Sequence, residues 1–317
     1  DVREKGRVKR EGGKLTGKPI KDQNGNTVYI PGSLNSVKAI GWYIEEYGVA
    51  QISMNLTNVS ITPVHIAFDE VCKRANARGI RVTGSEIVGL VPLKTMLDAG
   101  RYFLDKQHRS SGISDKEIIK IACKSMGLND LSKFKHEEKI IEYKMALSSS
   151  RPLINMSLQD FCEETASESP APGGGSISAY IGSLGVALGT MVANLSSHKR
   201  GWDDRWEEFS DWAVKGKKYH ERLCALVDED TFAFNKIMEA FSLPKSNEEE
   251  INERKSAIQA ATKYAIEVPF QVMKTACESM TVIKAMAGFG NPNSVTDAGV
   301  GALCARSAVV GAFLNVK

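Results

Sequence analysis

Short runs of β-favouring residues alternate with amphipathic stretches over about the first 145 residues. Val37 to Glu45 and Val49 to Leu56 are two such runs, and Glu46-Tyr47-Gly48 between them predicts an antiparallel hairpin. A third run, Ile80 to Val91, contains two glycines and predicts a further strand. Helices are expected to start at Pro63, at Pro92 and at the capping-box sequence from Ser114. This order predicts an α+β sandwich over residues 1–145.

The first 31 residues carry two weaker signals. Asp1 to Arg10 resembles the last turns of a helix and has no Met before it, so we expect the chain to begin inside a larger protein. Gly12 to Pro31 is rich in Gly, Lys and Asn, which predicts a surface excursion. Within it, Asp22 to Asn26 predicts a turn that leads into a short strand at Thr27 to Ile30.

Hydrophobic periodicity changes near Leu147, and no strand pattern follows it. The sequence Ser148-Ser149-Ser150-Arg151-Pro152 is typical of a linker, which we place at residues 146–156. Beyond it, apolar residues recur at helical spacing, with interruptions expected at Pro244 and Pro269. This pattern predicts an all-α helical bundle over residues 157–317. The predicted helices are Leu158 to Ser167, Gly175 to His198, Trp202 to Ala240, Asn247 to Met286 and Ser294 to Asn315.

One acidic residue of the second half falls on an apolar helix face. At 100° per residue, Asp230 lies in the middle of a narrow stripe, whereas Asp228 and Glu229 point elsewhere. A carboxylate there must pair with a partner, line a cavity or accept a raised pKa, because burying a lone charge is costly. Two interpretations stay open: a general acid/base, or an acid that caps or pairs with a neighbouring helix. The stripe consists of Leu223, Val227, Phe234, Ile237 and Phe241.

Two loops of the second half could contact a ligand. Gly173, Gly174 and Gly175 precede Ser176 at a helix start, where backbone amides could hold an anion or a carbonyl. A tight helix crossing would also explain this glycine run. The second loop, Gly288 to Asp297, contains Asn291 and Asn293. Its Ser294 and Asp297 have capping-box spacing, which is a sufficient structural reason for both.

The composition, 42% hydrophobic and 25% charged, is that of a soluble globular protein. Forty-one basic and 38 acidic residues give a net charge of +3, which is too balanced to predict nucleic-acid binding. Basic residues from Lys199 to Lys218 could meet an anionic substrate, but solvated helix faces are their default explanation. The charge-free stretch Ala171 to Ser197 is rich in small and polar residues, which favours a buried helix over a membrane span.

Cysteine and histidine positions favour neither disulfides nor a metal site. All six cysteines fall in predicted helices without a Cys-x-x-Cys pair, so we expect reduced core thiols in a cytoplasmic protein. None of the five histidines belongs to a metal-ligand cluster, and His65 is expected to be structural. The cysteines are Cys72, Cys123, Cys162, Cys224, Cys277 and Cys304.

Several stretches together resemble the formiminotransferase-cyclodeaminase family, the bifunctional folate enzymes of histidine degradation. The transferase half of that family is resembled by Ala39-Ile40-Gly41-Trp42-Tyr43, by Val88 to Lys94 and by Lys139 to Tyr143. The cyclodeaminase half is resembled by Ala171 to Ser176, by Leu226-Val227-Asp228-Glu229-Asp230 and by Phe313 to Val316. The resemblance covers nearly the whole chain in family order.

The resemblance implies a cyclodeaminase that closes 5-formimino-tetrahydrofolate to 5,10-methenyl-tetrahydrofolate and expels ammonia. The family's catalytic aspartate falls on Asp230. The glycine run, Ser176, Asn291, Asn293 and Asp297 become candidate folate contacts. The family also implies a homo-oligomer built from dimers, with this site at a dimer contact. Lys317 falls where the family continues into a final helix, so the domain is expected to be incomplete at its C-terminal end.

For residues 1–145 the resemblance implies the C-terminal subdomain of a glutamate formimidoyltransferase, with residues 1–10 as the tail of the preceding subdomain. Gly32, Ser33 and Leu34 would then contact tetrahydrofolate, the carrier that accepts the formimino group from N-formimino-glutamate. The transferase's histidine base belongs to a subdomain that nothing in this sequence matches. Two alternatives stay open: a methenyl-tetrahydrofolate cyclohydrolase, and a non-catalytic folate-binding or assembly module.

Overall fold

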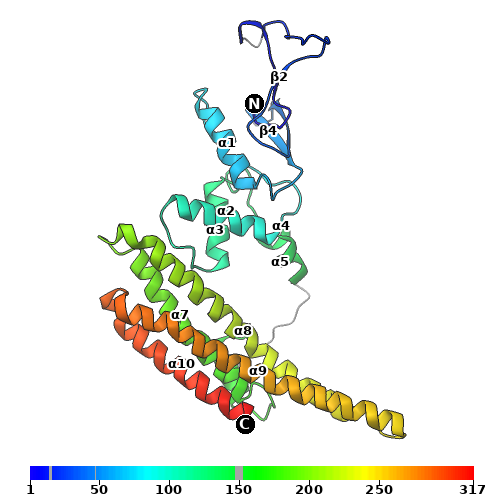
Figure 1. Ribbon diagram of the computed structural model, residues 1–317, viewed down its shortest axis with the longest axis vertical. Helices are drawn as coiled ribbons and strands as arrows, with labels where there is room; N and C mark the ends of the chain where they lie inside the picture. Colours follow the sequence, from blue (N-terminus) through cyan, green and yellow to red (C-terminus); the bar gives the residue numbers. More distant parts are fainter. Residues whose placement is uncertain (14–15, 47, 147–152) are drawn as a thin grey trace. The chain divides into compact units, whose positions relative to one another are not determined.

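The computed structural model describes residues 1–13, 16–46, 48–146 and 153–317 (Figure 1). Its contacts divide the chain into two compact units. The first comprises Asp1–Phe103 and Asp115–Leu147, and the second comprises Leu104–Ser114 and Ser148–Lys317. Residues 147–152 of the predicted linker lie outside the described residues.

The first unit contains the predicted hairpin. Strands β3 (Val37–Ile44) and β4 (Val49–Leu56) are antiparallel, and Val37 is paired with Leu56. The paired end of the hairpin is buried against α1 (Val64–Asn76), because alternate residues of each strand face one side. That small core contains Val2, Leu34, Val37, Ala67 and Val71.

Residues 1–10 contain a two-residue strand and not the predicted tail of a helix. β1 (Arg7–Val8) pairs antiparallel with β2 (Tyr29–Ile30), and η1 (Glu11–Gly13) follows β1. Strand pairing satisfies backbone groups that a lone helical turn would leave open. The predicted turn is confirmed, since the Asp22 carboxylate accepts hydrogen bonds from the amides of Asn24 and Asn26.

The predicted strand at Ile80 to Val91 is wrong for the described chain. This stretch makes a single isolated bridge, in which Val91 is paired in parallel with Ile140. Gly89 has a φ of +83°, a conformation that breaks an extended strand. The helices of this unit are α1, α2 (Leu93–Lys106), α3 (Asp115–Ser125), α4 (His136–Lys139) and α5 (Ile141–Ala146), and α2 runs on into the second unit.

The second unit is helical, as predicted. Its four long helices, α7 to α10, run in alternating directions (Figure 1). The other three helices all contact α7. Its elements are α6 (Leu158–Thr165), α7 (Gly174–Ser197), η2 (Asp203–Arg205), α8 (Trp206–Ser242), α9 (Glu248–Phe289), η3 (Pro292–Ser294) and α10 (Val295–Val316). The coarse prediction, α and β elements followed by helices alone, is therefore confirmed.

Small residues let α7 pack closely in the bundle. A side chain at Gly185 would meet the Gly301 carbonyl of α10 at 2.8 Å, and one at Gly216 of α8 would meet the Thr190 hydroxyl at 2.2 Å. By length and composition, α7 and the segment Pro292–Val316 are both candidate membrane spans. The apolar window of α7 is 61% buried inside the bundle, as a core helix requires, but that of Pro292–Val316 is only 22% buried.

Two detailed predictions differ from the structure. Pro269 does not interrupt its helix: α9 runs through it, and burial of Val268 and Val272 on either side maintains the helix. The six cysteines are free and helical, as expected, but they are not all core thiols. Cys123 is buried, which raises the pKa of its thiol to about 11, whereas Cys162 and Cys277 are exposed.

Candidate active site

Asp230 of α8 meets the N-terminal turn of α7. The backbone amide of Ser176 donates a hydrogen bond of 2.8 Å to Asp230 Oδ2, and the Ser176 hydroxyl lies 3.0 Å from the same oxygen. Amides in the first turn of a helix have no partner within the helix. The carboxyl from α8 supplies that partner, and the helix dipole favours a negative charge at this position.

The glycine run makes room for this contact. A Cβ atom at Gly175 would lie 2.2 Å from Asp230 Oδ1, so only glycine leaves the carboxyl in place. A Cβ atom at Gly174 would lie 3.2 Å from the Asn315 amide nitrogen of α10, a tight contact. Nothing lies nearer than 4.0 Å to the corresponding position at Gly173. Close packing therefore accounts for two of the three glycines, and Gly175 in particular serves Asp230.

Burial raises the pKa of Asp230, while the two hydrogen bonds from Ser176 act in the opposite direction. No basic side chain contributes to this shift. A carboxyl whose pKa moves toward neutrality can both accept and return a proton, which general acid/base chemistry requires. Asp230 is thus a candidate proton carrier.

The two acids beside Asp230 have structural partners, and both point away from it as the helical pattern predicts. Asp228 Oδ1 accepts a hydrogen bond of 2.9 Å from the amide of Leu153, whose side chain belongs to the bundle core. Glu229 forms an ion pair of 2.8 Å with Arg222 and accepts a hydrogen bond from the Tyr264 hydroxyl. Neither arrangement was apparent from the sequence, because each joins residues that are distant along the chain or on another element.

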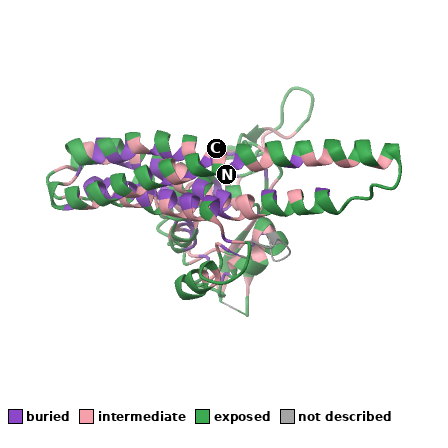
Figure 2. Cartoon of the chain, turned by 90° about the horizontal axis from the view of Figure 1, so that it is seen from below, coloured by how far each residue is buried: buried purple, intermediate pink, exposed green. Residues whose placement is uncertain are grey.

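The apolar stripe around Asp230 is buried at one end and exposed at the other. Leu223 and Val227 are fully buried, whereas Phe234 is 40% exposed and Phe241 is 52% exposed. The C-terminal end of α8 and the first turns of α9 extend past the other helices (Figures 1 and 2), and most of residues 231–260 are exposed. The carboxyl therefore lies where the packed core ends.

The other predicted folate contacts of this unit lie at the opposite end of α7. The amide of Asn291 donates to the Ser196 hydroxyl at 2.8 Å, and the Asn291 side chain accepts from the amide of Asn293. Ser176 and Ser196 are separated by most of α7, which corresponds to about 30 Å at 1.5 Å per residue. Within one chain, Asn291, Asn293 and Asp297 are thus not brought together with Asp230.

The same end of α7 holds a polar network that the sequence did not indicate. The Ser110 hydroxyl donates to Asn194 Oδ1 at 2.6 Å, and the Asn194 side-chain amide donates to the Gly112 carbonyl at 2.9 Å. The Ser110 amide donates to His198 Nε2 at 3.4 Å. Burial and nearby Arg109 lower the pKa of His198, which favours the neutral ring that can accept this bond. The network fixes the segment Leu104–Ser114 on the bundle.

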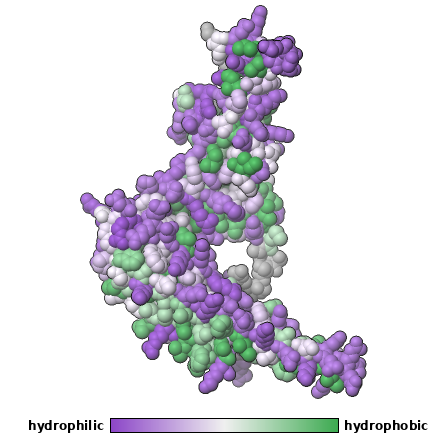
Figure 3. Space-filling model, viewed as in Figure 1, coloured by the Kyte–Doolittle hydropathy of each residue, from purple (hydrophilic) through white to green (hydrophobic). Residues whose placement is uncertain are grey.

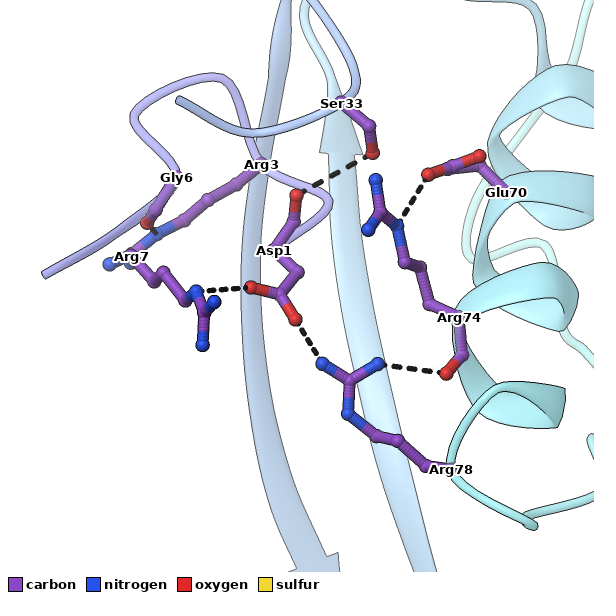
Figure 4. Close-up of polar contacts among 8 residues, drawn as sticks. All are labelled: Asp1, Arg3, Gly6, Arg7, Ser33, Glu70, Arg74 and Arg78. Atoms are coloured by element: carbon purple, nitrogen blue, oxygen red, sulfur yellow. Dashed lines mark hydrogen bonds and ion pairs between the residues drawn. The ribbon is translucent and has the colours of Figure 1, made fainter. Parts of the chain in front are cut away.

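In the first unit, Gly32, Ser33 and Leu34 run close beside the first residues of the chain. A Cβ atom at Gly32 would lie 1.7 Å from the Arg3 carbonyl, and the Leu34 side chain is buried in the core. The pKa of Glu70 is lowered mainly by a hydrogen bond with the Ser33 side chain, and a hydrogen bond with Arg74 lowers it further. Figure 4 shows four arginines around this loop, of which Arg7 and Arg78 pair with Asp1 and Arg74 pairs with Glu70; the fourth is Arg3.

His65 is buried in the first unit and packs against Tyr102, with 4.6 Å between ring centroids. Burial lowers the pKa of its imidazole, although nearby Asp98 and Asp69 act in the opposite direction. Over the described residues, no three His, Cys, Asp or Glu side chains are grouped so that they could hold a metal ion. One surface hollow, of about 350 Å³, is lined by Lys245 and residues of α9, and another, of about 400 Å³, is lined by residues of α9 and α10. Asp230 lines neither hollow.

Comparison with known proteins assigns both halves of the chain. Residues 157–317 match the model of the formiminotransferase-cyclodeaminase family, and residues 1–146 match that of the formiminotransferase domain. Formimidoyltransferase-cyclodeaminase of Gallus gallus is 39% identical over 287 residues, which is 90% of this chain and 53% of that protein. The corresponding protein of Dictyostelium discoideum is 36% identical over 308 residues, with the same coverage. The chain thus spans about half the length of these curated relatives.

Two further proteins each match about half of the chain. A methenyltetrahydrofolate cyclohydrolase of Methylorubrum extorquens is 33% identical over 167 residues, which is 51% of this chain and 80% of that protein. A solved structure of formiminotetrahydrofolate cyclodeaminase from Thermotoga maritima is 31% identical, with a TM-score of 0.44, and covers 51% of this chain and 77% of that one. The family model over residues 157–317, more than half of the chain, shows that this protein belongs to the formiminotransferase-cyclodeaminase family.

Proposed function

We propose that residues 157–317 form a cyclodeaminase that converts 5-formimino-tetrahydrofolate to 5,10-methenyl-tetrahydrofolate and ammonia, with Asp230 as its catalytic residue. The observation that carries this proposal is the carboxyl of Asp230 on the first turn of α7, with a pKa raised by burial. The family match over this half and the names of its relatives support the reaction.

A single carboxyl can serve both proton transfers of this reaction. N10 of the folate attacks the formimino carbon, and its proton passes to the Asp230 carboxylate. The same carboxyl then protonates the amino group on that carbon. The carbon–nitrogen bond breaks, ammonia departs, and the methenyl bridge remains between N5 and N10. A pKa moved toward neutrality suits a group that must first accept this proton and then return it.

The first unit, residues 1–145, is proposed as the C-terminal subdomain of the formiminotransferase, an α+β sandwich joined to the cyclodeaminase through residues 146–156. Gly32, Ser33 and Leu34 would contact tetrahydrofolate, and the formimino group would come from N-formimino-glutamate. Three of the four arginines beside this loop pair with Asp1 and Glu70. The fourth, Arg3, donates to the Gly6 carbonyl and supports the assignment, because a guanidinium group can also bind the carboxylates that both substrates carry. Since Leu34 is buried, its contact with folate would be made through the backbone.

The folate site of the cyclodeaminase is proposed to lie between copies of the chain in a cytoplasmic homo-oligomer built from dimers. The support is the separation of the predicted contacts: the glycine run and Asp230 at one end of α7, and Asn291, Asn293 and Asp297 about 30 Å away. Apolar side chains gather over α10 (Figure 3), where a second copy could cover them. The exposed ones are Val295, Val300, Leu303, Val310, Phe313 and Leu314.

The test follows methenyl-tetrahydrofolate by its absorbance after 5-formimino-tetrahydrofolate is added to the parent protein and to Asp230→Asn. We expect turnover by the parent and a loss of roughly 10²- to 10⁴-fold in the variant, with folate binding retained. Equal turnover by Asp230→Asn would overturn the catalytic assignment. Folate binding without turnover in the parent would instead favour the binding or assembly module.

One specific observation favours a second candidate, a methenyl-tetrahydrofolate cyclohydrolase, for residues 157–317. The relative that bears this name matches 51% of this chain over 80% of its own length. An assay for released ammonia separates the two reactions, since cyclodeamination liberates ammonia and hydrolysis does not. The transferase-like first unit argues for the cyclodeaminase.

A further inference from the structure

We propose that the Ser176 hydroxyl changes its hydrogen-bond acceptor as Asp230 gains and loses its proton, and that Ser176 is therefore a positioning residue for the reaction. The inference deepens the proposed function, since it assigns a role beside the catalytic carboxyl. It rests on the positions of the Ser176 hydroxyl, of its two close acceptors, and of the Asp230 oxygen that receives no hydrogen bond from the described residues.

The Ser176 hydroxyl has one hydrogen to donate and two close acceptors, while the Thr231 hydroxyl lies farther away, at 3.4 Å. The Ser176 Oγ lies 2.9 Å from the carbonyl oxygen of Val227 and 3.0 Å from Asp230 Oδ2. Ser176 is fully buried, so water does not supply a further partner at its surface. A hydroxyl carries a single O–H, so it can form one full-strength bond as a donor at a time.

The charge on Asp230 decides which acceptor is preferred. When the carboxyl is ionised, Oδ2 is the stronger acceptor, because hydrogen bonds to charged groups are roughly twice as strong as neutral ones. When the carboxyl is protonated, that advantage disappears and the hydroxyl can return to Val227. The amide of Ser176, at 2.8 Å, holds Oδ2 in both states. The buried hydroxyl thus keeps a partner in each state of Asp230.

This arrangement divides the work between the two carboxyl oxygens. Oδ2 receives both groups of Ser176. Oδ1 receives no hydrogen bond from the described residues, and it is not among their fully enclosed, unpartnered polar atoms. It lies against Gly175, which has no side chain. Oδ1 is therefore the oxygen that exchanges the proton, while Oδ2 anchors the group.

Ordinary helix packing does not explain the Ser176 contact. The other hydroxyls of α7 that lie in the described core donate to carbonyls of their own helix: Ser178 to Gly174, Thr190 to Val186 and Ser196 to Val192. Such back-bonding is the usual arrangement of a buried Ser or Thr in a helix. Ser176 instead reaches across to two acceptors on α8.

The test compares Ser176→Ala with the matched control Ser178→Ala, which also removes a buried hydroxyl from α7. The first readout is the pH dependence of cyclodeamination. Asp230 must be ionised to accept the N10 proton, so the loss of a stabilising bond should move the acid limb to higher pH in Ser176→Ala. On that limb its rate should fall about tenfold relative to the parent. Ser178→Ala should leave the limb unchanged, and Ser176→Thr, which retains the hydroxyl, should restore it.

The second readout is the titration of the Asp230 carboxyl by infrared difference spectroscopy between each protein and its Asp230→Asn derivative. It does not depend on turnover, so it decides the role of Ser176 even if the proposed reaction fails. Ser176→Ala should raise the pKa of Asp230, and Ser178→Ala should not. If the titration of Asp230 is the same in Ser176→Ala as in the parent, the inference is overturned and Ser176 is only a packing residue.

Discussion

At its N-terminal end, α7 meets an ionisable carboxyl from α8, whereas at its C-terminal end it meets neutral polar partners. Asp230 keeps one oxygen without a hydrogen bond from the described residues and has a raised pKa. Asn194 uses its side-chain oxygen and nitrogen together, bonding Ser110 and Gly112. One end thus holds a group that is poised to react, and the other holds groups that are already satisfied.

The difference shows how one buried helix can carry both stability and chemistry. A fully paired polar network contributes to structure, because each donor and acceptor has a partner in the folded state. A partly buried carboxyl without a basic partner carries an energetic cost, and such groups concentrate at functional sites. Variants at the two ends should therefore fail in different ways, which the following predictions test.

The largest effect is expected for Gly175→Ala. The new Cβ atom would lie 2.2 Å from Asp230 Oδ1, so the carboxyl must move away from its position on α7. Misplacement by about 1 Å can lower a rate about 100-fold, and overpacking costs about 1–3 kcal/mol of stability. Steady-state kinetics of cyclodeamination and urea unfolding measure the two effects.

Gly299→Ala is the matched control for that variant. Gly299 also lies in a helix, but a Cβ atom there has no neighbour within 4 Å. Replacing an exposed helical glycine with alanine should stabilise the protein by about 0.5–1 kcal/mol, and it leaves the Asp230 carboxyl in place. Parent-like turnover in Gly175→Ala would mean that the carboxyl tolerates displacement and that its position at the helix start is unimportant.

Asn194→Ala should affect stability rather than catalysis. The substitution removes two hydrogen bonds and leaves the Ser110 hydroxyl, which is 1% exposed, without its acceptor, although this hydroxyl still accepts from the Gly112 amide. An unsatisfied buried polar group costs about 1–3 kcal/mol. Urea unfolding should show this loss, while turnover of the fully folded protein changes less than twofold. A clear fall in turnover would break the comparison, since it would mean that the Asn194 network itself takes part in the reaction, in addition to the proposed folate contacts Asn291, Asn293 and Asp297.

The helical pattern could locate Asp230, because the positions of its neighbours on one helix follow from the period alone. Its contact with Ser176 could not be predicted, since it joins residues 54 positions apart on different helices. The placement of Asn291 also required the structure. In the sequence, the glycine run and Asn291 both belong to loops that precede a helix. In the structure they lie at opposite ends of α7, which follows from the direction in which the helices pack.

In the first unit the hairpin of β3 and β4 was predictable, because its partner strands are adjacent in sequence and joined by a turn. The strand expected at Ile80 to Val91 was not formed. A strand needs a neighbour along its length, and here the only strand-type pairing in the described chain is that of Val91 with Ile140. Local propensity favours an extended backbone but does not supply a distant partner.

The pH dependence of stability provides a smaller effect. Burial raises the pKa of Asp230 in the folded state above the ordinary value of 3.8, so the folded protein holds this proton more tightly than the unfolded chain. Stability from this group is complete below pH 3.8 and declines as pH rises through the raised folded pKa. Parent protein should therefore lose stability relative to Asp230→Asn over that window, as measured by urea unfolding at a series of pH values. The opposite slope would show that the Ser176 bonds outweigh burial.

The smallest effect is expected for Ser294→Ala, at the same end of the bundle as Asn291. The sequence predicts a capping box at Ser294 and Asp297, yet the Ser294 side chain makes no capping hydrogen bond to α10. Its removal should therefore change stability by less than about 0.5 kcal/mol. Ser157→Ala is the matched comparison, because the Ser157 hydroxyl caps α6 by accepting from the Asp160 amide at 3.0 Å, and its loss should cost about 1 kcal/mol. Equal losses in the two variants, measured by urea unfolding, would mean that Ser294 caps its helix in solution. The capping box that the sequence predicts would then contribute to the stability of the bundle at the C-terminal end of α7.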